Sequence, residues 1–175
     1  MTEKKQFPCP CGGKIKWKRD KVFIIAEAGI NMNGSLENAK KMIDLVRFAG
    51  ADAIKFQKRN INLVYSPEEL NKERITPFGK TNRELKEKLE FSIEDYKEID
   101  KYCKSKGLEW FVSCWDLESL KQMDQFDLKY QKVASPMLTV WPLVEEIAKR
   151  KKYTFISTGM AEMIEIEKVV SIFEK

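Results

Sequence analysis

Histidine is absent from all 175 residues of the sequence, and this absence narrows the chemistry open to the chain. Histidine is the commonest metal ligand in proteins and the side chain best suited to proton transfer near neutral pH. Any catalysis would therefore depend on carboxylates, lysines, hydroxyls and thiols, or on groups supplied by another chain.

Long apolar runs are absent too, and cysteines are few. No run is long enough to span a membrane, and the first residues, MTEKKQF, lack the apolar core of a signal peptide. The four cysteines lie in unlike contexts, which argues against a secreted disulfide framework. These absences predict a cytoplasmic protein that does not interact with membranes.

The positive charge is also small, at a net +5, and it is spread along the chain. Lysines are interleaved with glutamates on the expected helix faces, which is typical of solvated surfaces and does not indicate nucleic-acid binding. A hydrophobic fraction of 43% is enough for a sizeable core, so the composition indicates a globular protein of one or two domains.

Residues 1–21 are polar and basic, and we expect them to form a leader outside a folded domain at 22–175. The leader holds Cys9 and Cys11 in a Cys-x-Cys-Gly-Gly turn that resembles one knuckle of a zinc ribbon. A closed zinc site needs four ligands, and no second cysteine pair follows nearby. We therefore interpret the turn as part of an inert or redox-sensitive tail.

From Val22 onward, apolar strands alternate with amphipathic helices, which predicts an α/β fold with a parallel sheet covered by helices. Two architectures fit: an open doubly wound sheet, or about five of the eight units of a barrel, which usually needs about 250 residues when complete. The expected strands are Val22–Ala28, Ala53–Gln57, Leu108–Trp115, Tyr130–Ser135 and Tyr153–Thr158. The expected helices are Leu36–Ala49, Ile93–Lys106, Leu117–Gln125, Pro142–Lys149 and Ile164–Glu174.

The connection Lys58–Phe91 is much longer than a usual crossover and contains proline and glycine. A loop of this length in a compact fold is usually functional. It begins at the carboxyl end of a strand, so we expect it on the same side as the residues discussed next.

Two lysines lie inside apolar strands, close to the strand ends. Lys55 alternates with Ala53 and Gln57 and so shares a face with them, and Lys132 has a similar place in its strand. Hydroxyl groups follow at the same edge. Cations and hydroxyls at one mouth suit a phosphate and a carboxylate, and this pattern favours an anion site. The alternative is that both lysines extend to the rim or pair with acids on neighbouring strands. The hydroxyl residues are Ser113, Ser135, Ser157 and Thr158.

Glu27 is the acid of the first strand and stands at its carboxyl end. It is the candidate catalytic residue, either for proton transfer or for a hydrogen bond to a sugar or amide, and the alternative is a salt bridge to one of the two lysines. Asp116 is expected to cap the following helix. Cys114 is expected to line the mouth as a neutral thiol, without a base to activate it.

Several segments, in this order, resemble the N-acetylneuraminate (sialic acid) synthase family: AEAGINMNGS, GADAIKFQ, KRN…TPFGK…LEFS, VSCWD, KVASPMLT and ISTGM. The resemblance extends from Val22 to the end of the chain, and several motifs in register make it specific. It implies a parallel (β/α)8 TIM-type barrel, of which about five units are present here. It also implies a small antifreeze-like domain beyond them that reaches over a partner's active site, hence a homodimer.

By this resemblance, the family condenses phosphoenolpyruvate with an N-acetylated sugar such as N-acetylmannosamine, using a divalent metal (Mn or Mg). Lys55, Lys132, Ser135 and Ser157 match positions that hold phosphoenolpyruvate. Glu27 and Gln57 match positions that contact the acceptor sugar.

The chain departs from the family pattern at several points. The family's metal ligands are two histidines on later strands, so this chain supplies no metal ligand. Met32, Met137 and Cys114 replace a histidine, a glutamate and a threonine that many members carry. We expect the chain to be inactive alone, and the alternatives are a non-catalytic partial barrel that binds a phosphorylated metabolite and a non-functional truncated product.

Overall fold

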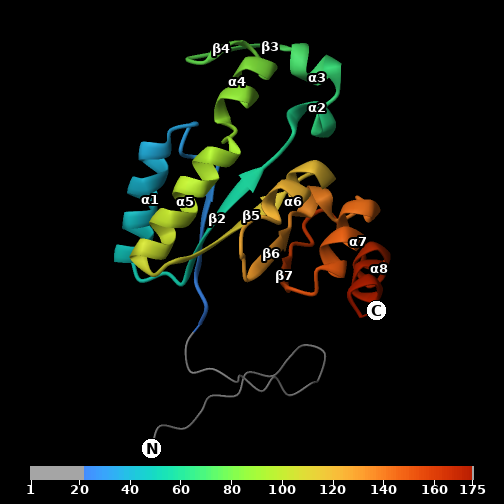
Figure 1. The fold of residues 1–175 in the computed structure, drawn as a ribbon. Coiled ribbons are helices and arrows are strands. Elements are labelled where there is room, and N and C mark those ends of the chain that lie inside the picture. The colour runs from blue at the N-terminus through green and yellow to red at the C-terminus, as the bar shows by residue number, and fades with distance from the viewer. Residues whose placement is uncertain (1–21, 175) are drawn as a thin grey trace, which may run out of the picture.

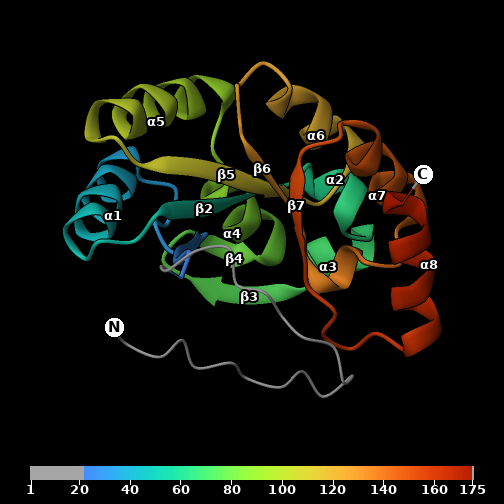
Figure 2. The ribbon, with the colours of Figure 1, turned by 90° about the horizontal axis from the view of Figure 1, so that it is seen from below.

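The computed structural model describes residues 22–174, which form an α/β fold built on parallel strands. β1, β2 and β5 pair in that order, and β6 pairs with β7, all in parallel. Seen from below, the strands follow one another along a curved wall (Figure 2). The predicted parallel sheet is confirmed, whereas the expected leader, with Cys9 and Cys11, lies outside the described residues. The strands are β1 Ile25–Gly29, β2 Ala53–Lys58, β5 Glu109–Cys114, β6 Tyr130–Val133 and β7 Tyr153–Ile156.

Helices cover the outer side of this wall, with α1 beside α5 and with α7 between α6 and α8 (Figure 1). Within residues 22–174, no helix is long and apolar enough to cross a membrane. The helices are α1 Leu36–Phe48, α5 Ile93–Lys106, α6 Leu117–Met123, α7 Trp141–Lys149 and α8 Met163–Phe173, with a short 3₁₀ helix η1 at Ser135–Met137.

The helix ends follow the signals in the sequence. The side chain of Ser35 accepts a hydrogen bond from the amide of Asn38 at the start of α1, and Ser92 forms a capping box with Asp95 at the start of α5. Gly107 ends α5 with φ 62°, a left-handed conformation that favours glycine. Local chemistry therefore fixes where these helices begin and end.

The hydrophobic core lies between the outer faces of the strands and the helices. Ile54 and Phe56 of β2 are fully buried there, together with Ile43 of α1 and Ile99 of α5. Burying each such side chain stabilises the fold by roughly 1.5–3 kcal/mol. Because successive residues of a strand point to opposite sides, the alternate residues of β2, Lys55 and Gln57, lie on the inner face.

Aromatic rings fill the inner face from the start of the strands up to the level of Lys55. Phe111 of β5 lies in register with Lys55 and stacks on Phe155 of β7, with ring centroids 5.7 Å apart. Phe23, just before β1, has its ring centroid 5.2 Å from that of Tyr130 and 6.2 Å from that of Phe155. Phe23 therefore joins the beginning of β1 to β6 and β7.

Residues 59–90, called the excursion below, leave the carboxyl end of β2 and return to α5 (Figure 1). We expected one long connection here, and the structure shows five short elements instead. Side-chain caps from Asn60, Ser66 and Thr81 hold its helices, which are too short to show a hydrophobic periodicity in the sequence. The elements are α2 Ile61–Val64, α3 Pro67–Asn71, β3 Glu73–Thr76, β4 Gly79–Thr81 and α4 Asn82–Leu89.

Candidate functional site

The strand register brings Glu27 and Lys55 side by side on the inner face. The Nζ atom of Lys55 lies 2.7 Å from Oε2 of Glu27. The lysine side chain is only 3% exposed, whereas the glutamate side chain is 59% exposed. The salt bridge that we gave as the alternative for Glu27 is therefore present. It provides the buried ammonium group with a counter-ion and leaves the carboxylate open to solvent.

Lys132 reaches the end of the neighbouring strand β7. Its Nζ atom donates hydrogen bonds to Oγ of Ser157 and, at 2.9 Å, to the carbonyl of Val133. Partial burial lowers the pKa of the Lys132 ammonium, and repulsion by the Lys55 ammonium lowers it further. Two lysines from β2 and β6 thus add positive charge to one inner face, as the sequence predicts.

Ser135 and Gln57 complete the set of predicted residues. Ser135 opens η1, and a Cβ atom built on Gly159 would lie 3.5 Å from its Oγ, so this hydroxyl is close to the segment that follows Ser157. On β1, a Cβ atom built on Gly29 would lie 3.7 Å from Nε2 of Gln57. Each predicted residue therefore lies within three residues of the carboxyl end of a parallel strand, the end at which ligands of this fold class bind.

Ser113 adds a hydroxyl that we predicted only as one of several at this edge. It lies in register with Gln57 and is completely buried. Among residues 22–174, its Oγ atom has no hydrogen-bond partner. A buried hydroxyl without a partner costs free energy, so this orphaned donor indicates a place where a ligand atom would be favourable.

The structure corrects the expected place of Cys114. We expected its thiol to line the mouth, but Cys114 is 3% exposed and belongs to the core between the strands and the helices. Burial raises the pKa of the Cys114 thiol to about 12, so the thiol is neutral, as predicted. Strand alternation gives the reason: Ser113 and Cys114 are successive residues, so only one of them faces inward.

Asp116 serves the role that we expected, which is structural. Its Oδ1 accepts a hydrogen bond of 2.7 Å from the amide of Ser119, so it caps α6. Met32, where many family members have histidine, is 2% exposed and packs in the core. The loop that contains Met32 therefore anchors the start of α1 and presents no imidazole.

The inner face does not fit a divalent cation. Mg²⁺ and Mn²⁺ prefer several oxygen ligands, and here the carboxylate of Glu27 is bound by Lys55 beside a second lysine. In the part of the chain that the structure describes, no three acidic or cysteine side chains are grouped to hold a metal ion. No step proposed below passes through a metal.

Parallel strands that carry cationic and hydroxyl side chains near their carboxyl ends are the arrangement at which proteins of this fold class bind their ligands. The family to which the chain belongs is the NeuB family, whose model matches residues 42–175, and which comprises sialic acid synthases and related acid synthases, transferases of TIM-barrel type. The predicted family resemblance is thereby confirmed.

Two curated relatives show the range of the family. The chain is 35% identical over 153 residues to an N-acetylneuraminate-9-phosphate synthase of Drosophila melanogaster, covering 86% of this chain and 41% of that protein. It is 33% identical over 158 residues to an N,N'-diacetyllegionaminic acid synthase of Campylobacter jejuni, covering 89% of this chain and 47% of that protein. The chain therefore spans less than half the length of these relatives.

Solved structures support the same fold. A sialic acid synthetase from Leptospira borgpetersenii, crystallised with citrate, superposes with a TM-score of 0.75 at 30% identity, covering 89% of this chain and 50% of that chain. A phospho-2-dehydro-3-deoxyheptonate aldolase from Thermotoga maritima superposes with a TM-score of 0.60 at 8% identity, which supports the fold alone.

Proposed function

We propose that residues 22–175 are a sialic-acid-synthase-like domain containing about five of the eight β/α units of a barrel, and that its inner face binds phosphoenolpyruvate. The observation that carries this proposal is the convergence of Lys55 and Lys132 beside the unpartnered hydroxyl of Ser113. Phosphoenolpyruvate carries a phosphate and a carboxylate, and ammonium and hydroxyl donors suit both groups.

In this proposal, different residues bind the two substrates. Lys55, Lys132, Ser135 and Ser157 hold the phosphate and carboxylate. Gln57 and Glu27 face the acceptor, an N-acetylated amino sugar of the N-acetylmannosamine type. The exposed carboxylate of Glu27 is placed to accept a hydrogen bond or a proton from an acceptor hydroxyl, and Lys55 stabilises its negative charge.

In the complete reaction, C3 of phosphoenolpyruvate attacks the aldehyde carbon of the open-chain sugar and forms the new carbon–carbon bond. Water then adds to C2, and phosphate leaves from the resulting tetrahedral intermediate. The two lysines would stabilise the negative charge on the phosphate as it departs. A cytoplasmic location and a homodimeric full-length form belong to the same proposal.

A second candidate function is binding without turnover. The observation that favours it is the donor set of the inner face, which suits an anion and does not fit the divalent cation expected for the family. On this view the chain holds the phosphorylated substrate, and catalysis requires groups beyond the described residues.

Isothermal titration of phosphoenolpyruvate into the purified chain tests the proposal. We expect saturable binding that weakens by about tenfold or more in Lys55→Ala and in Lys132→Ala, because each loses a charge-assisted hydrogen bond. Lys129→Ala is the matched control, because it removes the same charge from an exposed lysine that pairs with Glu109. If the folded wild-type chain binds no phosphoenolpyruvate, or if all three variants behave alike, the proposal is wrong.

A further inference from the structure

The end of β2 is held more firmly than strand pairing requires. Four consecutive residues, 57–60, each have one backbone group that is hydrogen-bonded to a different residue. The carbonyl of Gln57 accepts a hydrogen bond of 2.8 Å from the Tyr96 hydroxyl, and the carbonyl of Lys58 accepts one of 3.1 Å from the amide of Trp115. The amides of the next two residues are bound by carboxylates, as described next.

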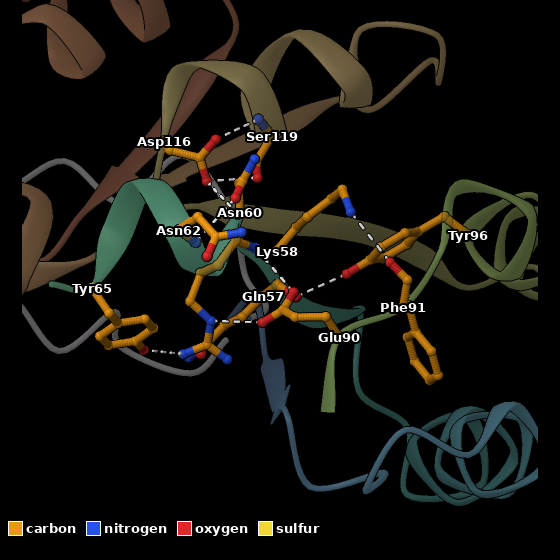
Figure 3. A network of polar contacts seen from close by, with 11 residues as sticks. Gln57, Lys58, Asn60, Asn62, Tyr65, Glu90, Phe91, Tyr96, Asp116 and Ser119 are labelled. Carbon is orange, nitrogen blue, oxygen red and sulfur yellow. Dashed lines mark hydrogen bonds and ion pairs between the residues drawn. The ribbon is translucent and has the colours of Figure 1, made fainter. Parts of the chain in front are cut away.

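Two carboxylates, the partly buried Glu90 and the buried Asp116, complete this arrangement (Figure 3). Oε2 of Glu90 accepts a hydrogen bond of 3.0 Å from the amide of Arg59, and Oε1 accepts one of 2.7 Å from the Arg59 guanidinium. Oδ2 of Asp116 accepts a hydrogen bond of 2.7 Å from the amide of Asn60. The Arg59 and Glu90 side chains are only 8% and 13% exposed, so this ion pair is shielded from solvent.

The same contacts hold the first and last residues of the excursion together. Arg59 and Glu90 are its first and last residues, and just outside them the Nζ atom of Lys58 donates a hydrogen bond of 3.2 Å to the carbonyl of Phe91. Two neighbouring pairs, Lys58 with Phe91 and Arg59 with Glu90, therefore join the two ends of the excursion at the end of β2.

Tyr96 is the member of this network that touches Gln57 directly. It comes from α5 on the outer side of the wall, is completely buried, and stacks on Trp110 with ring centroids 6.0 Å apart. Burial, with the negative charge of Glu90, raises the pKa of Tyr96 well above its usual value of 10.0. Its hydroxyl therefore remains a hydrogen-bond donor at any pH at which the protein is handled.

Gln57 connects these restraints to the inner face, where we propose that the ligand binds. Its carbonyl is held from the outside by Tyr96, while its side chain belongs to the inner face, in register with Ser113 and beside Gly29. Fixing the backbone at this residue fixes the Cα–Cβ direction from which the side chain extends, and a restrained group loses less entropy when it binds a ligand.

We infer that Tyr96, supported by the Arg59–Glu90 pair, is a positioning residue that acts through Gln57 and sets the affinity of the inner face for the acceptor sugar. This inference rests on the proposed function, since it assigns a further role within the same site. Tyr96 itself does not touch the ligand in this assignment.

The test compares Tyr96→Phe with Tyr102→Phe. Both remove one hydroxyl from α5, but the Tyr102 hydroxyl donates to the exposed Asp44, at 2.8 Å. With phosphoenolpyruvate present, N-acetylmannosamine is titrated and followed by NMR. We expect Tyr96→Phe to weaken sugar binding by about five- to tenfold, the range for one hydrogen bond, and Tyr102→Phe to leave it unchanged.

Two further variants separate positioning from a general loss of structure. Gln57→Ala is expected to abolish the effect of Tyr96→Phe, because it removes the side chain through which Tyr96 is proposed to act on the sugar, so the two effects are not additive. Glu90→Gln keeps the shape of the side chain and is expected to weaken sugar binding while phosphoenolpyruvate affinity stays within about twofold. Additive losses in the double variant, or equal effects of Tyr96→Phe and Tyr102→Phe, overturn the inference.

Failure of the inference is distinguishable from failure of the proposed function. The side-chain amide signals of Gln57, assigned by their loss in Gln57→Ala, report its environment without any ligand. A shift or broadening of these signals in Tyr96→Phe and not in Tyr102→Phe supports positioning, and unchanged signals overturn it. A wild-type chain that binds neither phosphoenolpyruvate nor the sugar overturns the proposed function alone.

Discussion

At the scale of single residues, alternation along one strand was predictable from the sequence, whereas the register between strands was not. The inward direction of Lys55 and Gln57 follows from alternation along one strand, and the structure confirms it. Alternation along β5 places only one of Ser113 and Cys114 on the inner face, but which of the two depends on the register with β2, which the sequence does not provide. For this reason Cys114 was assigned to the wrong face, and the unpartnered hydroxyl of Ser113 was not recognised.

The lowered pKa of Lys132 leads to a prediction about pH. The ammonium form binds an anion, and this lysine loses its proton at a lower pH than the usual value of 10.5. Affinity for phosphoenolpyruvate should therefore fall as the pH rises over the alkaline range below 10.5, earlier than an ordinary lysine would cause. Titration calorimetry across this range measures the fall.

Lys132→Arg is the informative variant in that experiment, because an arginine keeps its charge throughout the range. We expect its affinity to change much less with pH than that of the wild-type chain. An equal decline in both proteins would show that the titrating group is not Lys132.

At the scale of elements, prediction succeeded where length and periodicity were adequate. α1 and α5 carry apolar stripes, serine caps and terminal glycines, and both were located from the sequence to within a residue or two. The prediction failed for the excursion because its elements are short and largely polar. Neither the helical nor the strand period of apolar residues is visible over such lengths. What holds it together is a set of specific hydrogen bonds, which only the structure shows.

Asn82 provides a prediction for this polar module. It is 6% exposed, and its Nδ2 donates hydrogen bonds to the carbonyl of Glu69, at 3.0 Å, and to the carboxylate of Glu69, at 3.2 Å. Asn82→Ala leaves these acceptors without their donor and should destabilise the excursion locally by about 1–3 kcal/mol. Hydrogen exchange should show faster exchange within residues 59–90 and unchanged protection in β2 and β5.

Asn62→Ala is the control for this experiment, because Asn62 belongs to the same module but its side chain is exposed and accepts only from Arg83, at 2.8 Å. It should leave exchange in the excursion nearly unchanged. Faster exchange throughout the molecule in Asn82→Ala would mean that the excursion is not a separate unit of stability.

At the scale of the whole molecule, the strands form two paired groups, and aromatic side chains connect them. β1, β2 and β5 form one ladder, and β6 and β7 form the other. Phe111 of β5 packs against Tyr130 of β6, with ring centroids 5.8 Å apart, and Phe23 reaches both Tyr130 and Phe155. Side-chain packing at the amino-terminal end of the inner face therefore contributes much of the coupling between the two groups.

This arrangement predicts how the molecule unfolds when Phe23 is removed. Phe23→Ala deletes the ring that touches β6 and β7, and we expect a loss of about 1–3 kcal/mol, less than for a fully buried phenylalanine, because Phe23 is half-buried. Phe48→Ala is the matched control, since that ring is 91% exposed at the end of α1 and should matter little. Urea unfolding followed by circular dichroism and by tryptophan fluorescence measures the stability of both variants.

In Phe23→Ala the transitions reported by the two methods should separate, because β6 and β7 lose a ring contact that does not support β1, β2 and β5. Coincident transitions with unchanged stability would show that the Phe23 ring is not needed to join the two groups.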